Sequence, residues 1–271
     1  MGLRRLTRWP SPTSQSRQWS PSYALVALAT GWGMSAVLVL ALRVVGIPIP
    51  ASIAPLAFEV VLMASLFPLY RNGALRPVDL GLRRAPGPRS VMYATTALIA
   101  YVVGARMWAA FVHVGVGRGE FSALGDQGTA VIVLAGIVAV VGAPIAEEIF
   151  FRGFLYRSLR NRMGIAPACV TSAILFSIGH VQYPVAALPE LFLFGVIMAL
   201  LYERTGSLLP GIAVHAFVDA SAFEEALTGN NAAVLALFVL GAIVILMRPV
   251  LRAVERGITG KPIFVEANGN R

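Results

Sequence analysis

Long apolar stretches, separated by short polar segments, run along most of the chain. About 20 apolar residues are enough for a helix to cross a bilayer, and eight stretches reach or approach that length. The predicted spans are residues 23–45, 51–70, 91–114, 129–151, 165–182, 184–201, 208–223 and 232–247. This pattern predicts an all-α fold, a polytopic membrane helix bundle of about eight transmembrane helices.

The two ends of the chain have a different pattern. Residues 1–20 are rich in Arg, Ser and Pro and have too few apolar side chains to form a core. They predict a disordered, basic cytoplasmic arm. Residues 251–271 predict a polar C-terminal tail. The transmembrane helical domain is therefore expected over residues 21–250.

The amino-acid composition narrows the class of protein. Of the 271 residues, 57% are hydrophobic and only 13% are charged, and the mean hydropathy is +0.75. These values are typical of an integral membrane protein. Cys169 is the only cysteine, which excludes an intramolecular disulfide and a thiolate metal cluster.

The formal net charge of +9 comes from arginines that gather between apolar stretches and at both ends of the chain. Cytoplasmic loops of membrane proteins carry such an excess of Lys and Arg. We therefore expect a multi-pass protein of a bacterial plasma membrane, with both termini in the cytoplasm. No nucleic-acid recognition motif accompanies the charge, so membrane lipids are expected partners and nucleic acids are not.

Two adjacent glutamates, Glu147 and Glu148, lie within the fourth apolar stretch. A carboxylate within a bilayer is costly and faces the protein interior or a wet cavity, so it marks a candidate functional site. Glu148 and Arg152 are four residues apart, on one helical face, and are expected to pair. Glu147 points about 100° away around the helix, which leaves it available as a general base.

Two histidines also lie within apolar stretches. His180 ends one stretch, and His215 is followed four residues later by Asp219, so His215 and Asp219 share one helical face. If the chain reverses near residues 163–164, Glu147 and His180 lie at similar depth in an antiparallel helix pair. We expect these side chains to converge on one recessed, polar active-site cavity.

Three motifs occur in order on successive apolar stretches. They are Glu147-Glu148-x-x-x-Arg152, Phe176-x-x-x-His180 and His215-x-x-x-Asp219. Together they resemble the motifs of the CPBP intramembrane proteases, a family that includes the type II CAAX prenyl endopeptidases, bacteriocin-processing and immunity proteins, and the Abi proteins. The motif-bearing region covers residues 129–223, and members of this family commonly have an eight-helix core.

The resemblance implies an intramembrane endopeptidase with a defined set of site residues. Glu147 would activate a water for attack on a peptide carbonyl, and His180 would help to hold that water. His215 and Asp219 would stabilise the oxyanion. The residues that organise the site would be Glu148, Arg152 and Phe176.

Two mechanisms stay open for this site. The family's third motif ends in Asn or Asp, and a carboxylate such as Asp219 donates a hydrogen bond only when it is protonated. A metal-binding or water-binding role therefore also fits Asp219. Together with Glu147, His180 and His215, it is a suitable type of ligand for zinc. The resemblance implies either a divalent-metal peptidase or a glutamate-activated water alone.

Three functions fit these features. The first is hydrolysis of a membrane-associated peptide or protein substrate, lipidated or CAAX-like. The second is a non-catalytic membrane scaffold or bacteriocin-immunity protein of the same fold, which binds a peptide or a sensor partner. The third is a proton-coupled transporter, since buried carboxylates and histidines occur there too; the lack of an inverted sequence repeat argues against it. A simpler interpretation treats both glutamates as satisfied helix-packing groups or as a proton relay.

Overall fold

The protein is described here by a computed structural model that covers residues 19–46, 55–83, 87–112, 128–180 and 183–228. The chain divides into two units, residues 1–230 and 231–271, and all the described residues belong to the first. Within these residues the regular structure is helical throughout, which confirms the predicted all-α fold.

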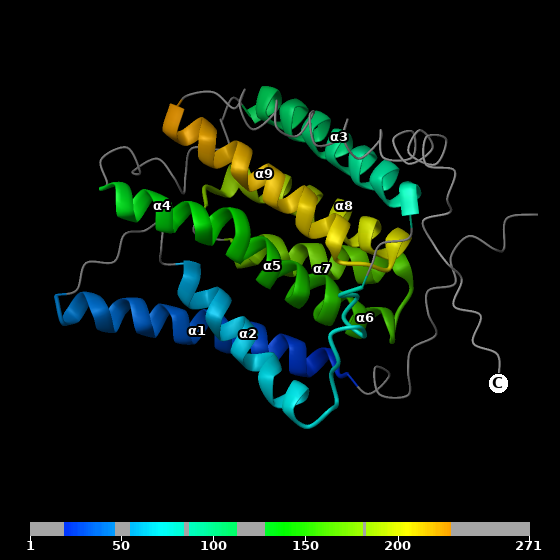
Figure 1. Cartoon of the computed structure of the whole chain (residues 1–271), viewed down its shortest axis with the longest axis horizontal. Helices are drawn as coiled ribbons and strands as arrows, with labels where there is room; N and C mark the ends of the chain where they lie inside the picture. The colour runs from blue at the N-terminus through cyan, green and yellow to red at the C-terminus, as the bar shows by residue number, and fades with distance from the viewer. Residues whose placement is uncertain (1–18, 47–54, 84–86, 113–127, 181–182, 229–271) are drawn as a thin grey trace, which may run out of the picture. The chain divides into compact units, whose positions relative to one another are not determined.

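Seven of the eight predicted spans fall on helices (Figure 1). The fourth span is one long helix with changes of pitch, and the predicted end at residue 151 is too early because this helix continues through Arg160. The elements are α1 (Pro21–Val44), α2 (Pro55–Arg71), α3 (Gly87–Val112), α4 (Thr129–Ile137), η4 (Val138–Gly142), α5 (Ala143–Glu147), η5 (Glu148–Tyr156), α6 (Arg157–Arg160), α7 (Ile165–Gly179), η6 (Val185–Ala187), α8 (Leu188–Thr205) and α9 (Leu209–Thr228).

Four helices in the described part of the chain are long and apolar enough to cross a membrane. They are Pro21–Val44, Gly87–Val112, Thr129–Arg160 and Val185–Thr205, and α7 is a shorter apolar helix. The protein is therefore a multi-pass membrane protein. The count of eight spans and the cytoplasmic termini stay predictions. The eighth span, the C-terminal tail and nearly all of the basic arm lie outside the described residues.

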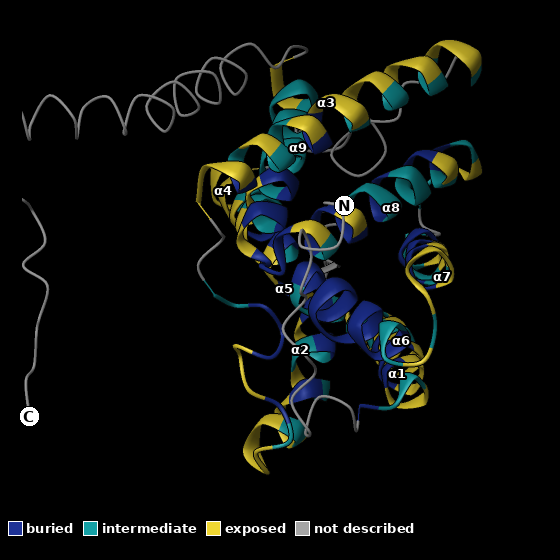
Figure 2. Cartoon of the chain, turned by 90° about the vertical axis from the view of Figure 1, so that its right-hand side faces the viewer, coloured by how far each residue is buried: buried dark blue, intermediate teal, exposed yellow. Residues whose placement is uncertain are grey.

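The long helix of residues 129–160 has the other helices packed around it. It contacts α1 and α2 in one part of the bundle and α7, α8 and α9 in another (Figure 1). Its second half is almost fully buried, whereas α1, α3 and α4 present exposed faces (Figure 2). The exposed faces are rich in apolar side chains, as expected for surfaces that lipid covers.

The long helix changes pitch on both sides of Pro144. The wider π-helical turns of η4 end at Gly142, just before this proline, and those of η5 begin at Glu148. A proline inside a helix has no N–H to donate, so the regular hydrogen-bond ladder is interrupted there. Widened turns of this kind are frequent at functional sites, and here they adjoin the two glutamates.

The segment of residues 74–83 packs against the end of the bundle where α8 turns into α9. Tyr202 donates a hydrogen bond to the Leu80 carbonyl at 2.8 Å, and the backbone N–H of Leu208 donates to the Gly81 carbonyl at 2.9 Å. Arg157, at the start of α6, is buried and donates to the Asp79 carbonyl. This segment therefore anchors the long helix near its C-terminal end.

The Asp79 side chain is the basis of a pH-dependent prediction. Arg76, hydrogen-bonded to it at 2.8 Å, holds the pKa of the Asp79 carboxyl below its usual range, against the opposing effect of burial. A lowered pKa means that the ionised form stabilises the fold above about pH 4, and that this contribution is lost on acidification. We expect Asp79→Asn to lower the unfolding temperature in detergent at pH 7. The deficit should shrink below about pH 4.

A deficit that stays constant between pH 7 and pH 3 would contradict this assignment. Glu225→Gln is the matched control, because no ion pair of Glu225 was found among the described residues.

Candidate functional site

Three ionisable side chains from two helices form the centre of the site. Glu148 Oε1 lies 2.9 Å from Arg152 Nη1 and 3.1 Å from His215 Nδ1. The side chains of Glu148 and Arg152 are each 1% exposed. An ionised carboxylate can only accept hydrogen bonds, so the Nδ1 of His215 carries the hydrogen in this contact. The predicted Glu148–Arg152 pair is present, and it also joins η5 to α9.

Glu147 lies between the two histidines. Its Oε1 is 3.6 Å from His180 Nε2, and its Oε2 is 3.7 Å from His215 Nε2. His180 Nδ1 lies 2.8 Å from the Phe176 carbonyl oxygen. A carbonyl can only accept, so His180 Nδ1 donates and its Nε2 faces Glu147 as a lone pair in the neutral ring. Distances near 3.6 Å are too long for direct hydrogen bonds, so a shared water is the natural link.

Asp219 and two aromatic rings complete the surroundings of His215. Asp219 Oδ2 lies 3.6 Å from His215 Nε2, one helical turn along α9. The Phe194 ring of α8 packs edge-on against the His215 ring, with centroids 4.7 Å apart. The Arg152 guanidinium lies over the Phe176 ring, 4.4 Å from its centroid. The aromatic rings restrict the orientation of the charged groups through these contacts.

All seven predicted site residues lie close together. The contacts above connect Glu147, Glu148, Arg152, Phe176, His180, His215 and Asp219. They come from the long helix, α7 and α9, which supports the predicted antiparallel pairing on either side of residues 163–164. The Asp219 side chain is 27% exposed, whereas Glu147 is 8% exposed. The site is therefore more open toward Asp219 than toward Glu147.

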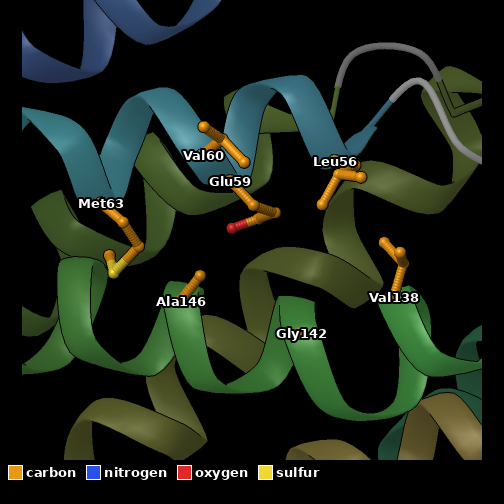
Figure 3. A pocket seen from close by; sticks show the side chains of 7 residues that line it. All are labelled: Leu56, Glu59, Val60, Met63, Val138, Gly142 and Ala146. Carbon is orange, nitrogen blue, oxygen red and sulfur yellow. The ribbon is translucent and has the colours of Figure 1, made fainter.

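Glu59, which lies on α2, was not among the predicted site residues. Its carboxyl lies close enough to that of Glu147 to interact with it electrostatically. Glu59 also lines an otherwise apolar cavity of about 290 Å³ between α2 and the long helix (Figure 3). Glu59 is the one acidic residue of the predicted span 51–70, and an acidic residue within an apolar span marks a candidate functional position.

Gly211 allows α9 to approach the buried carboxylate closely. A Cβ atom at this position would lie 2.9 Å from Glu148 Oε2 and 3.4 Å from the Met198 methyl group. Gly211 precedes His215 by one helical turn, so the same approach brings the His215 ring to Glu148. A larger residue at this position would therefore force the Glu148 side chain or α9 to shift.

The site does not present a ready set of metal ligands. Among the residues that the structure describes, no group of three or more His, Cys, Asp or Glu side chains is arranged to hold a metal ion. The Nδ1 of His215 is bonded to Glu148, and its Nε2 is the atom shared by Glu147 and Asp219. Zinc binding by Glu147, His180, His215 and Asp219 therefore stays a prediction, and the chemistry below is derived from the side chains alone.

The fold and the site define a class of protein, a helical membrane protein with a buried acid–histidine site. Residues 129–221 match the family model described as "Type II CAAX prenyl endopeptidase Rce1-like". This chain therefore carries a domain of the Rce1-like type II CAAX prenyl endopeptidase family, which confirms the resemblance that the motifs predicted. No match was found among the curated proteins or the solved structures.

The buried ion pair generates a stability prediction. Removing one partner of a buried pair leaves an uncompensated charge and costs about 3–5 kcal/mol, whereas removing both charges costs far less. We expect Arg152→Met to destabilise the protein strongly and Glu148→Gln with Arg152→Met to recover much of the loss. Unfolding in mixed detergent micelles measures both variants. Additive losses would contradict a direct pairing.

The close approach at Gly211 generates a second prediction. Gly211→Ala should push Glu148 away from His215 and lower the free energy of unfolding by about 1–3 kcal/mol. Gly33→Ala is the control, because a Cβ atom at Gly33 meets nothing within 4 Å. That control should be neutral or slightly stabilising, since alanine favours helices. Equal stability of the two variants would show that α9 can shift at no cost.

Proposed function

We propose that this protein is an intramembrane endopeptidase that hydrolyses peptide bonds of membrane-associated peptides. The observation that carries the proposal is the position of Glu147. This carboxylate is buried between two histidine nitrogens, which lie 3.6 and 3.7 Å from its oxygens. The neighbouring residue Glu148 forms an ion pair with Arg152. The Glu147 carboxylate can take a proton from a water that the histidines help to position.

His180 is proposed to hold the attacking water. With its Nδ1 hydrogen directed at the Phe176 carbonyl, the neutral ring offers the Nε2 lone pair to one hydrogen of that water. Glu147 Oε1 accepts the other hydrogen and becomes protonated as the water oxygen attacks the peptide carbonyl carbon. A fixed base at hydrogen-bond reach of the water contributes about 10²- to 10⁴-fold to the rate.

His215 is proposed to stabilise the oxyanion. A carboxylate at position 219 cannot donate to a negatively charged oxygen. The His215 ring can, because its Nδ1 hydrogen is directed at Glu148 and a proton on Nε2 would point toward the space near Glu147 and Asp219. The role assigned to Asp219 is to support this imidazolium form, and so to place a donor where charge develops in the transition state.

The reaction is then completed without a covalent bond between the substrate and the protein. The tetrahedral intermediate collapses and the carbon–nitrogen bond breaks. Protonated Glu147 returns its proton to the leaving nitrogen, so that the products are a carboxylic acid and an amine, and the acid then loses its proton to the amine or to water. Glu148 and Arg152 act through His215, as positioning residues that hold the ring in one orientation.

The proposed substrates are hydrophobic or lipidated peptides, among them prenylated CAAX-like peptides. Two observations support this class. The family match is to a group of prenyl endopeptidases, and the helices that surround the site expose apolar faces. A peptide bearing a lipid would be concentrated at the membrane that contains the site.

Replacement of Glu147 tests the proposal. Detergent-purified wild type and Glu147→Gln are assayed against a panel of fluorogenic lipidated peptides, with and without a chelator and added zinc. We expect Glu147→Gln to lower kcat by about 10²- to 10⁴-fold with little change in KM. Glu225→Gln, on the last turns of the same helix as His215, is the matched control and should cleave like the wild type.

Full activity of Glu147→Gln would contradict the proposed base. Activity that is lost on chelation and restored by zinc would contradict the metal-free mechanism while leaving the endopeptidase in place. A folded wild type that binds the peptides without cleaving any of them would favour the scaffold or immunity function.

A further inference from the structure

A second polar pair lies close to the site and has no part in the mechanism above. The Tyr101 hydroxyl of α3 donates a hydrogen bond to Glu190 Oε1 of α8 at 2.8 Å. Glu190 is only 7% exposed. Its second oxygen, Oε2, is buried without a hydrogen-bond partner among the described residues.

The position of Glu190 connects it to the catalytic cluster. Glu190 precedes Phe194 by four residues, so both side chains lie on the same face of α8, about 6 Å apart along the helix. The Phe194 ring packs against His215, and the Tyr101 ring packs edge-on against Phe194 with centroids 5.0 Å apart. Tyr101 also lies within electrostatic range of Asp219, at the more open side of the site.

A purely structural pair does not account for Glu190. A buried acceptor without a donor costs about 1–3 kcal/mol, and more when it is charged. Glutamine would keep a bond with Tyr101 without that charge. Arg106, on the same helix as Tyr101, lies within electrostatic range of Glu190, but it leaves Oε2 without a donor. The carboxylate is thus held in place by one oxygen, while the other is a buried acceptor with no donor among the described residues.

The surroundings point to the kind of donor that fits. A second cation, such as a lysine ammonium, would be repelled by Arg106. A peptide N–H is neutral and adds no charge. An extended peptide advances about 3.3–3.6 Å per residue, so an N–H one or two residues from the scissile bond reaches one helical turn along α8.

We propose that Glu190 is a specificity-determining residue that accepts a backbone N–H of the bound peptide through Oε2, with Tyr101 as the positioning residue that fixes its carboxylate. This inference rests on the proposed endopeptidase function. It adds a binding subsite formed by α3 and α8, so that an extended backbone is recognised beside the bond to be cut.

Backbone N-methylation tests this subsite directly. The probe is a fluorescently labelled peptide that ends in farnesyl-Cys-Val-Ile-Met, a CAAX pattern, together with versions methylated at one peptide nitrogen at a time. For wild type we expect methylation at one position to raise KM by about tenfold to a hundredfold, as for loss of a hydrogen bond to a charged group. In Glu190→Ala the same methylation should change KM by less than about threefold.

Tyr101→Phe is the second variant, and it keeps the folded helix packing because only the hydroxyl is removed. It should raise KM for the unmethylated peptide and leave kcat unchanged. Affinity measured by fluorescence anisotropy in the Glu147→Gln background repeats the comparison without turnover. Glu225→Gln serves as the control in both assays.

The outcomes separate the two proposals. Unchanged sensitivity to N-methylation in Glu190→Ala, with the peptide still bound, would overturn the subsite alone. Loss of kcat with unchanged KM in Tyr101→Phe would also overturn it. Failure of the wild type to bind any of the peptides would contradict the endopeptidase function and the subsite together.

Discussion

The site depends on the contact between the buried Glu148 carboxylate and its two partners. Glu148 pairs with Arg152 at 2.9 Å and with the His215 ring at 3.1 Å. An unpaired charge at this depth would be too costly to retain, so the pair and the ring must be present together. Because His215 belongs to another helix, the same contact fixes the distance between the long helix and α9. Gly211 makes this separation small enough for the ring to reach the carboxylate.

This constraint leaves Glu147 as the group available for chemistry. Adjacent residues on a helix point in different directions, so Arg152 pairs with Glu148, whereas Glu147 faces the Nε2 atoms of the two histidines. Its neighbours are two histidine nitrogens and the carboxyl of Glu59, which α2 contributes. The segments outside the matched region of residues 129–221 therefore contribute to the site as well. The helix α2 brings Glu59 to the base, and α3 brings Tyr101 to Glu190.

Local spacing predicted much of this arrangement. The apolar runs predicted seven of the helices. The four-residue separation predicted the Glu148–Arg152 pair. The chain reversal after α6 predicted that Glu147 and His180 lie close together. The changes of pitch around Pro144 were not predicted, because a proline alone does not specify a π-helical turn. The contact of Glu59 with Glu147 and the contact of Tyr101 with Glu190 each join residues that are far apart in sequence. They depend on which helices are neighbours in the bundle, and no periodicity in one sequence encodes that.

The most direct test of the central claim asks whether Glu147 acts as a base or as a nucleophile. Wild-type protein is allowed to cleave a lipidated peptide in water enriched in heavy oxygen, and the products and the protein are analysed by mass spectrometry. A base predicts heavy oxygen in the new carboxylate of the product and none in the Glu147 side chain. Heavy oxygen in the Glu147 carboxylate would reveal a covalent acyl intermediate, and would contradict the account of Glu147 as the residue that activates water.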